Sequence, residues 1–137
     1  MSERGFFDTN ILIYTDDKRE PRKRNLCLAL LAHHQKTRSG AISLQVLQEY
    51  YAVVTRKMHV DPELARYKVS LFAHMDVMRP DVPDLIAAID NHCLHKISFW
   101  DGLILQAAEA MQCRILYSEN FQAKRSYNGI RIVNPFL

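Results

Sequence analysis

The chain is poor in the features that mark secreted, zinc-binding and membrane-spanning proteins. Its three cysteines, Cys27, Cys93 and Cys113, are an odd number and form no Cys-x-x-Cys pair. This pattern argues against a disulfide framework and a zinc ribbon, and it fits a reducing compartment best. No stretch approaches about 18 uninterrupted apolar residues, and the N-terminal stretch MSERG contains no apolar signal-peptide segment. We therefore expect a cytoplasmic protein without a membrane span.

Several common catalytic motifs are missing as well. There is no Gly-x-Gly-x-x-Gly fingerprint and no P-loop, so the usual nucleotide-binding motifs are not indicated. The six histidines form no His-Glu-x-x-His zinc-protease motif. The serines Ser43, Ser98 and Ser118 lack the Gly-x-Ser-x-Gly elbow of α/β hydrolases. The stronger candidates for chemistry are carboxylates.

The bulk composition is that of an ordinary globular protein. With 137 residues, 48% of them hydrophobic and 24% charged, the chain is long enough to bury a core, and we expect a single domain over residues 1–137. The net charge of +3 is compatible with a nucleic-acid partner without establishing one. Lys and Arg cluster at residues 18–24, 56–57 and 124–125, although such runs are usually solvated faces.

Apolar residues alternate between short extended runs and helical spacings. Strands are predicted at 5–8, 41–43, 76–79, 114–117 and 129–133. Helices are predicted at 10–14, 25–34, 44–57, 62–74, 83–95 and 99–111, with a charged loop at 16–24. The apolar stripe of the third helix is predicted to consist of Leu44, Leu47, Tyr51 and Val54. Strands alternating with such helices imply an α/β fold, a three-layer α/β/α sandwich with a mainly parallel central sheet.

Polar residues follow two of the predicted strands. Asp8-Thr9-Asn10 comes directly after the first strand, and Ser118-Glu119-Asn120 comes after the fourth. In open parallel sheets, ligands bind beyond the carboxyl ends of the strands. Each cluster also has a purely local explanation, because Asp is a good helix N-cap and Ser and Asn are common in turns.

Two further carboxylates, Glu49 and Asp101, lie in predicted helices. Glu49 points away from the apolar stripe of its helix, so a solvated side chain is one interpretation. Asp101 is in the first turn of a helix and forms a Ser-x-x-Asp capping pattern with Ser98, which explains it without any function. Phe99 and Trp100 are bulky, and we expect them to hold Asp101 against a buried helix start.

Taken together, the acidic positions suggest a metal site. Mg²⁺ prefers oxygen ligands, keeps several waters and needs only one or two direct carboxylates. Carboxylates at two strand ends and in two helices can converge at one pocket rim, where a cation relieves their mutual repulsion. Acids that hold metal, surrounded by Lys and Arg that hold a polyanion, are what a phosphodiester-cleaving enzyme needs.

Four sequence motifs then point to a known family. FFDTNILIY at the start, the helix that carries Glu49, SFWDGLILQAA, and ILYSENFQ with GIRIVNPF occur in an order and spacing that resemble the PIN-domain nucleases. The resemblance is strongest to the toxin ribonucleases of bacterial toxin–antitoxin pairs, the VapC type, and it covers nearly the whole chain. It implies a three-layer α/β/α fold and RNA hydrolysis that depends on Mg²⁺ or Mn²⁺.

The resemblance also implies the site residues. Asp8, Glu49 and Asp101 match three acidic positions of the family. The fourth motif here has Asn120 where an Asp is common, so either Glu119 supplies the missing charge or the site holds its metal with three acids. By this resemblance Asp8 and Asp101 ligate the metal directly. Glu49 and Glu119 ligate through water, or position and deprotonate the attacking water.

The supporting residues are Thr9, Asn10, Ser118 and Asn120. Of these, Thr9 and Ser118 are expected to orient the carboxylates beside them. Family resemblance further implies a homodimer and a cognate antitoxin protein with a segment that inserts into the active-site groove. The helices at 25–34 and 62–74 are the expected interface elements.

Two alternatives compete with this interpretation. A haloacid-dehalogenase-type phosphatase also carries an Asp after its first strand, but it needs a second Asp two residues later, where this chain has Asn10. A non-catalytic PIN-like protein that binds RNA or acts as a scaffold remains open, because Asn120 replaces an acid. Metal binding and RNA cleavage distinguish this alternative from a nuclease.

Overall fold

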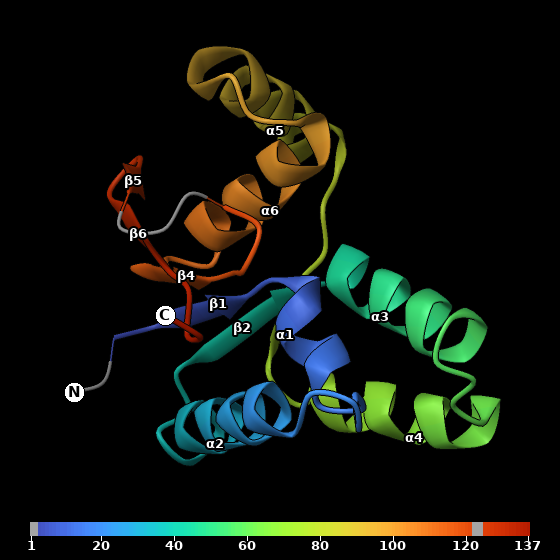
Figure 1. Cartoon of the computed structure of the whole chain (residues 1–137). Helices are drawn as coiled ribbons and strands as arrows, with labels where there is room; N and C mark the ends of the chain where they lie inside the picture. The colour runs from blue at the N-terminus through green and yellow to red at the C-terminus, as the bar shows by residue number, and fades with distance from the viewer. Residues whose placement is uncertain (1–2, 122–124) are drawn as a thin grey trace.

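A mostly parallel sheet between two layers of helices forms the computed structural model, which describes residues 3–121 and 125–137 (Figure 1). The strands are β1 (Gly5–Phe7), β2 (Gly40–Ser43), β3 (Asp76–Met78), β4 (Ile115–Tyr117), β5 (Ser126–Tyr127) and β6 (Ile130–Val133). The helices are α1 (Thr9–Tyr14), α2 (Pro21–Lys36), α3 (Leu44–Arg56), α4 (Pro62–Phe72), α5 (Val82–His95) and α6 (Phe99–Ala110). The predicted α/β sandwich is confirmed.

The strand order across the described sheet is β3-β2-β1-β4-β6-β5. Every neighbouring pair is parallel except β5 and β6, which are antiparallel. Helices α1 to α4 lie on one side of the sheet, and the α5–α6 pair lies on the other (Figure 1). Chain order reverses at β1, which has β2 on one side and β4 on the other. In such sheets the crevice beyond the carboxyl end of the switch strand is the usual binding place.

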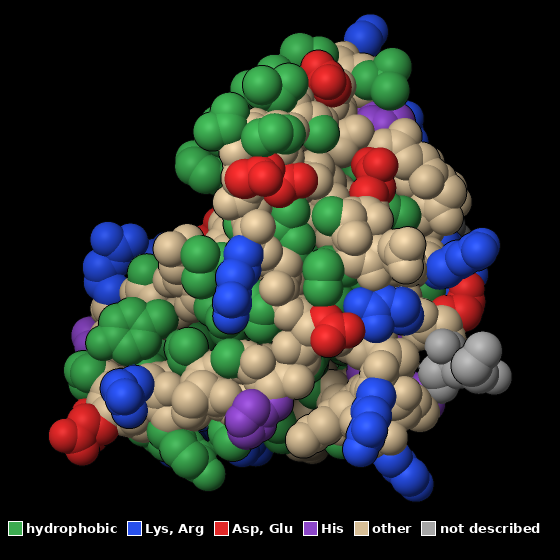
Figure 2. Space-filling view, turned by 180° about the vertical axis from the view of Figure 1, so that it is seen from behind, with side chains coloured by type: hydrophobic (Ala, Val, Ile, Leu, Met, Phe, Trp, Pro, Cys, Tyr) green, Lys and Arg blue, Asp and Glu red, His purple; other side chains and the backbone are tan. Residues whose placement is uncertain are grey.

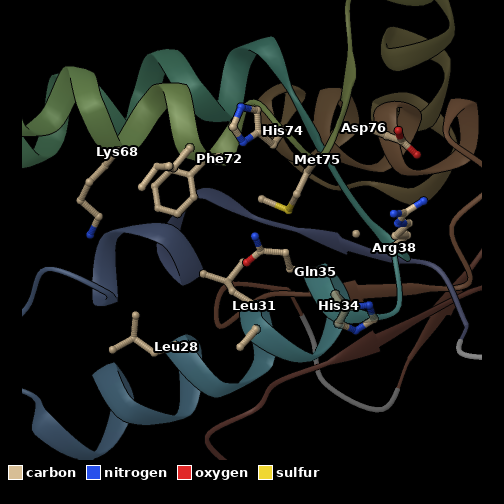
Figure 3. A pocket seen from close by; sticks show the side chains of 13 residues that line it. Leu28, Leu31, His34, Gln35, Arg38, Lys68, Phe72, His74, Met75 and Asp76 are labelled. Atoms are coloured by element: carbon tan, nitrogen blue, oxygen red, sulfur yellow. The ribbon is translucent and has the colours of Figure 1, made fainter.

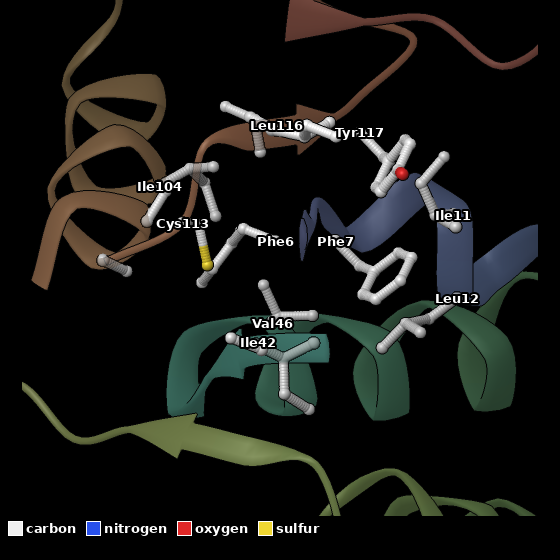
Figure 4. Close-up of a cluster of buried hydrophobic side chains, with 14 of the residues drawn as sticks. Phe6, Phe7, Ile11, Leu12, Ile42, Val46, Ile104, Cys113, Leu116 and Tyr117 are labelled. Carbon is white, nitrogen blue, oxygen red and sulfur yellow. The ribbon is translucent and has the colours of Figure 1, made fainter. Parts of the chain in front are cut away.

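The core is built around the apolar residues of β1. Phe6 and Phe7 are fully buried, with Leu116 of β4 on one side and Ile42 of β2 on the other (Figure 4). Phe7 also stacks on the Tyr117 ring at a centroid distance of 5.3 Å. Burying one such side chain stabilises a fold by roughly 1.5–3 kcal/mol, so β1 is firmly fixed.

A buried histidine of α2 packs against this core and is within hydrogen-bond distance of β4. His34 of α2 is 2% exposed, with Nδ1 2.7 Å from Ser39 Oγ and Nε2 2.8 Å from the Tyr117 hydroxyl. Burial lowers the pKa of His34 below its usual value. Gly5 is required here, because a Cβ at this position would lie 2.6 Å from the Tyr117 ring.

Three helices begin with the side-chain caps that the sequence predicts. Asp8 accepts a hydrogen bond from the Thr9 backbone N–H at the start of α1, and Ser43 and Ser98 cap α3 and α6. Such caps satisfy backbone donors that the helix itself leaves unpaired. They also fix the position of each helix start relative to the strand or loop before it.

Helix α2 begins at Pro21, four residues before the predicted start, so much of the expected charged loop is helical. Its first turn is anchored by side chains: Arg22 donates to the Phe136 carbonyl at 3.1 Å, and Arg24 donates to the Thr15 carbonyl at 3.2 Å. Proline suits a first helical turn, and these long-range contacts hold the turn in place.

The predicted stripe of α3 is wrong in part. Tyr50 is fully buried and donates a hydrogen bond of 2.5 Å to Asp16, whereas Tyr51 is 39% exposed and Leu44 is 41% exposed. Lys68 of α4 donates to the other oxygen of Asp16 at 2.7 Å, so α1, α3 and α4 meet at this carboxylate. The polar partner Asp16 explains why the fully buried position is Tyr50.

The two-residue strand β5 was not predicted. It pairs with β6 through a turn at Asn128 and Gly129, which both have positive φ angles of 53° and 82°. Lys124 of the predicted basic cluster lies outside the described residues. Over the described residues, no helix has the length and apolar character needed to cross a membrane.

Helix α5 exposes apolar side chains on the face turned away from α6. Val82, Leu85, Ile86 and Ile89 are each at least 39% exposed and follow helical spacing. Figure 2 shows apolar side chains gathered at this end of the molecule. On the same view Lys and Arg side chains are spread over the surface and form no single stripe.

Candidate active site at the carboxyl ends of the strands

Asp8 directly follows β1, at the carboxyl end of this central strand, and is 6% exposed. Its Oδ1 accepts a hydrogen bond of 2.7 Å from the Thr9 backbone N–H, and its Oδ2 accepts one of 2.7 Å from the Ser118 hydroxyl. Ser118 is fully buried, and its Oγ accepts in turn from the Asn120 N–H at 3.1 Å. The two predicted polar clusters therefore meet, and the Asp8–Ser118 hydrogen bond joins them.

The environment of Asp8 disfavours its charged form. Burial, helped by the charges of Asp101 and Glu49, raises the pKa of the Asp8 carboxyl from 3.8 to about 6, and the hydrogen bonds from Ser118 and Thr9 only partly oppose this rise. A buried carboxylate with two like charges nearby is typical of a functional site. A bound cation would relieve this cost.

Glu49 is turned toward α1 rather than free in solvent. Its Oε2 accepts a hydrogen bond of 2.8 Å from the Thr9 hydroxyl, and its Oε1 accepts one of 2.8 Å from Gln45 Nε2. Thr9 thus holds two acids, Asp8 through its backbone and Glu49 through its side chain. Gln45 was not predicted, although its position four residues before Glu49 on one helix face was a usable signal.

Asp101 occupies the first turn of α6, where its N–H donates to the Ser98 hydroxyl at 3.0 Å. Burial raises the pKa of Asp101, the Ser98 hydrogen bond lowers it, and the charge of Glu49 raises it. Asp101 also raises the pKa of Asp8, so these three carboxylates act on one another electrostatically. The expectation that Phe99 and Trp100 hold Asp101 against a buried helix start is wrong for Trp100, which is 63% exposed.

Glu119 has a different environment. One of its oxygens lies 2.5 Å from Lys23 Nζ of α2, and the other accepts a hydrogen bond of 2.5 Å from the Tyr14 hydroxyl. Burial raises the pKa of Glu119, but the hydrogen bonds from Lys23 and Tyr14 outweigh it, so the pKa is lowered overall. Lys23 also lies 5.0 Å from the centre of the Phe136 ring. Glu119 is therefore a paired anion held toward α2.

Asn10 carries an unpaired polar atom beside this cluster. Its Oδ1 accepts from the Glu119 N–H at 3.4 Å, while its Nδ2 is buried with no hydrogen-bond partner in the part of the chain that the structure describes. Leaving a buried donor unpaired costs about 1–3 kcal/mol. Such a donor is suited to a ligand oxygen or a water. Asn120, the other amide predicted to support the site, is exposed.

The donor set suits a hydrated hard cation rather than a closed metal cage. Across residues 3–121 and 125–137, no three His, Cys, Asp or Glu side chains form a ready-made ligand group. Mg²⁺ and Mn²⁺ tolerate this, because an ion of this kind takes one or two carboxylates and completes its shell with water and phosphate oxygens. Asp8 and Asp101, with raised pKa values and oxygen donors only, fit such an ion.

The basic run at residues 18–24 is largely used within the fold. Arg22 and Arg24 bind backbone carbonyls, and Lys23 binds Glu119. Arg19 pairs with Asp17 at 3.2 Å and remains 84% exposed. The run therefore anchors α2 beside the carboxylates and does not form a free basic arm.

The fold and this carboxylate cluster agree with the match to a family model. The model of the PIN domain matches residues 5–127, and the chain belongs to the PIN-domain family. A comparison with curated protein sequences finds no match.

Three solved structures share the fold over most of both chains. VapC20 of Mycobacterium tuberculosis, a sarcin-ricin-loop-cleaving toxin, has a TM-score of 0.69 and 18% identity, with 85% of this chain and 89% of the other covered. A toxin–antitoxin complex from Klebsiella pneumoniae has a TM-score of 0.69 and 21% identity, with 96% and 97% covered. VapBC2 of Rickettsia felis, bound to a promoter DNA fragment, has a TM-score of 0.69 and 20% identity, with 93% and 96% covered. At these identities the likeness establishes the fold.

Proposed function

We propose that the protein is a metal-dependent endoribonuclease and the toxin of a toxin–antitoxin pair. The observation that carries the proposal is the buried Asp8 carboxylate, which is bound by Ser118 and Thr9 and subject to the charges of Asp101 and Glu49. Membership of the PIN-domain family supports nuclease chemistry. The shared fold with VapC20, a sarcin-ricin-loop-cleaving toxin, supports RNA as the substrate.

In this proposal Asp8 and Asp101 would hold a Mg²⁺ or Mn²⁺ ion directly. When bound, such an ion lowers the pKa of a bound water and stabilises charge on a phosphoryl oxygen. Glu49, oriented by Thr9 and Gln45, positions the attacking water and accepts its proton. The water oxygen would bond to phosphorus, the P–O bond to the leaving nucleotide would break, and the leaving oxygen would take up a proton from solvent water. Glu119 lies at the rim of the site, where it is paired with Lys23 and is not a direct metal ligand in this proposal.

The proposal is tested with purified protein and RNA. Wild type should cleave RNA in Mg²⁺ or Mn²⁺ and should be thermally stabilised by Mn²⁺. Asp8→Asn should lose both properties and keep its far-UV circular dichroism spectrum. Full activity of Asp8→Asn would refute the site. Neither cleavage nor Mn²⁺ stabilisation of wild type would instead favour the non-catalytic RNA-binding or scaffold protein.

The partner in this proposal is an antitoxin, as in the solved complex from Klebsiella pneumoniae. A groove of about 630 Å³ between α2 and α4 is proposed as its docking surface, which differs from the active-site groove that the family resemblance implies. Leu31, Phe72 and Met75 make it apolar, and Lys68 and Asp76 lie at its margin (Figure 3). Its lining includes Gly40 and Asp76, the first residues of β2 and β3. An amphipathic helix of the antitoxin fits this surface, and Leu31→Glu should abolish the complex while RNA cleavage persists.

We also propose a homodimer. A second copy would cover the exposed apolar face of α5, since a symmetric dimer packs one face against the same face of its partner. This differs from the expected use of the helices at 25–34 and 62–74. Light scattering measures the oligomer, and Ile86→Glu should produce a monomer where Leu64→Glu, on the exposed face of α4, does not.

A further inference from the structure

Trp100 is the chain's one tryptophan, and its side chain is unusually open to solvent. It is 63% exposed, whereas its neighbour Phe99 is half-buried. Tryptophan is highly buried on average in folded proteins, so an indole left this exposed on a helix start calls for an explanation. The adjoining residue, Asp101, is one of the three electrostatically linked carboxylates.

The backbone that carries Trp100 is fixed. Ser98 caps α6 by accepting the Asp101 N–H at 3.0 Å. One residue further on, Gly102 allows α5 to pack so closely that a Cβ there would lie 2.6 Å from the Ala88 carbonyl oxygen. The first turn of α6 is therefore held from two sides.

The ring itself is supported by Phe99. The two ring centroids are 5.1 Å apart with an interplanar angle of 63°, an edge-to-face contact. Such pairs are favourable and orient both rings. Trp100 is thus an exposed aromatic surface with a supported orientation.

The position of this surface relates it to the carboxylates. Trp100 directly precedes Asp101 in the first turn of α6, and the charge of Asp101 acts on Asp8. Helix α6 begins on the side of the molecule to which β1 and β2 point (Figure 1), and Asp8 directly follows β1. A polynucleotide with a phosphate at Asp8 and Asp101 would bring a neighbouring base within reach of Trp100.

We propose that Trp100 is a base-stacking platform, on which an unpaired RNA base next to the scissile phosphate lies against the indole. The inference rests on the proposed function. Proteins that bind single-stranded RNA stack its unpaired bases on aromatic side chains. Because every base has a π-face, the platform holds the strand in place without choosing a sequence. A protein covering Trp100 is the competing occupant, and the experiment separates the two.

Fluorescence provides the test, because Trp100 is the sole source of tryptophan emission. The Asp8→Asn variant binds RNA without cleaving it in this proposal. Titration with a 12-nucleotide single-stranded RNA should quench its emission to saturation, and a blunt duplex of equal length should quench it much less. Anisotropy of the same RNA carrying a fluorescein label measures binding independently of Trp100.

Variants then measure how much the platform contributes. In the Asp8→Asn background, Trp100→Ala should weaken single-stranded RNA binding by about 5- to 150-fold, in line with stacking on an aromatic side chain. Trp100→Phe should recover most of this loss. Tyr67→Ala is the matched control, since Tyr67 is a 58% exposed aromatic residue on α4, and its RNA affinity should be unchanged.

Three outcomes would overturn the platform. One is RNA binding by anisotropy with no change in Trp100 emission. Another is an unchanged affinity in Trp100→Ala. The third is an emission shift that follows protein concentration without RNA, which would assign Trp100 to a protein interface. Saturable quenching together with no RNA cleavage by wild type would keep the platform and reject the nuclease.

Discussion

The hydroxyl of Thr9 donates a hydrogen bond of 2.8 Å to Glu49, a residue 40 positions further along the chain. This contact joins α1 to α3 beside the carboxylate that the Thr9 backbone holds. A catalytic acid that must orient water depends on such contacts, because small misplacements are costly.

Thr9→Val should therefore impair catalysis more than folding. The substitution keeps the shape of the buried side chain and removes its hydroxyl, and hydrogen bonds to charged groups are worth about 1.5–3 kcal/mol. We expect kcat to fall roughly 10- to 100-fold, while Thr9→Ser keeps most of the activity. Steady-state cleavage of a fluorogenic RNA measures both variants. A Thr9→Val enzyme with wild-type kcat would show that Glu49 needs no orientation.

Asp8 should make stability depend on pH in the metal-free protein. Its folded pKa of about 6 lies above the ordinary 3.8, so the native state binds this proton more tightly than the unfolded state. The resulting stabilisation is complete below about pH 4 and is lost as the pH rises through 6, about 3 kcal/mol in total. Mn²⁺ binding should strengthen over the same interval.

The Asp8→Asn variant isolates this effect. His34, with its lowered pKa, acts in the opposite direction, because folding then loses stability as the pH falls below about 6.5. The quantity to measure is thus the difference in urea-unfolding free energy between wild type and Asp8→Asn at pH 4 to 7. Asp8→Asn should become the more stable of the two as the pH rises. A difference that is constant with pH would contradict the raised pKa.

The Lys23–Glu119 ion pair should matter more for stability than for metal binding. Glu119→Gln and Lys23→Met should each lower the melting temperature, and the double variant should lose less than the two combined, because each single change leaves the other charge unpaired. Glu119→Gln should keep most of its Mn²⁺ affinity by calorimetry, unlike Asp101→Asn. Loss of Mn²⁺ binding in Glu119→Gln alone would make Glu119 a ligand.

Gly102→Ala should separate α5 from α6. The added Cβ would meet the Ala88 carbonyl oxygen at 2.6 Å, and this crowding should outweigh the better helix propensity of alanine. We expect a loss of about 1–3 kcal/mol in urea unfolding. Gly129→Ala is the control, because its Cβ has open space and only its φ of 82° is unfavourable. Stabilisation by Gly102→Ala would mean that the helices adjust freely.

The sequence predicted what depends on local chemistry. The caps at Ser43 and Ser98, and the polar residues after β1 and β4, follow from side-chain type and position along one element. The choice between Tyr50 and Tyr51 for the core did not, because Tyr50 is selected by Asp16, 34 residues away.

In the candidate site too, the sequence predicted the residues themselves but not the contacts between distant parts of the chain. Asp8, Glu49 and Asp101 were predicted, and the charge of Glu49 contributes to the raised pKa values of Asp8 and Asp101. The pairing of Glu119 with Lys23 spans 96 positions and depends on where α2 begins, which the sequence misjudged. The exposure of Trp100 likewise depends on how α5 and α6 pack, so a local pattern had no means to predict it.

Helix α2 is one 16-residue helix, about 24 Å long, with its first turn beside Glu119 and its last turns beside Gly40 at the start of β2. Its first turn holds Glu119 through Lys23, and its last turns line the groove beside α4 through Leu31 and Gln35. A protein bound in that groove would therefore contact the C-terminal half of the helix whose first turn pairs with Glu119. If such a partner displaced α2, the distance between Lys23 and Glu119 would change. The partner would then alter the carboxylate site without contacting RNA.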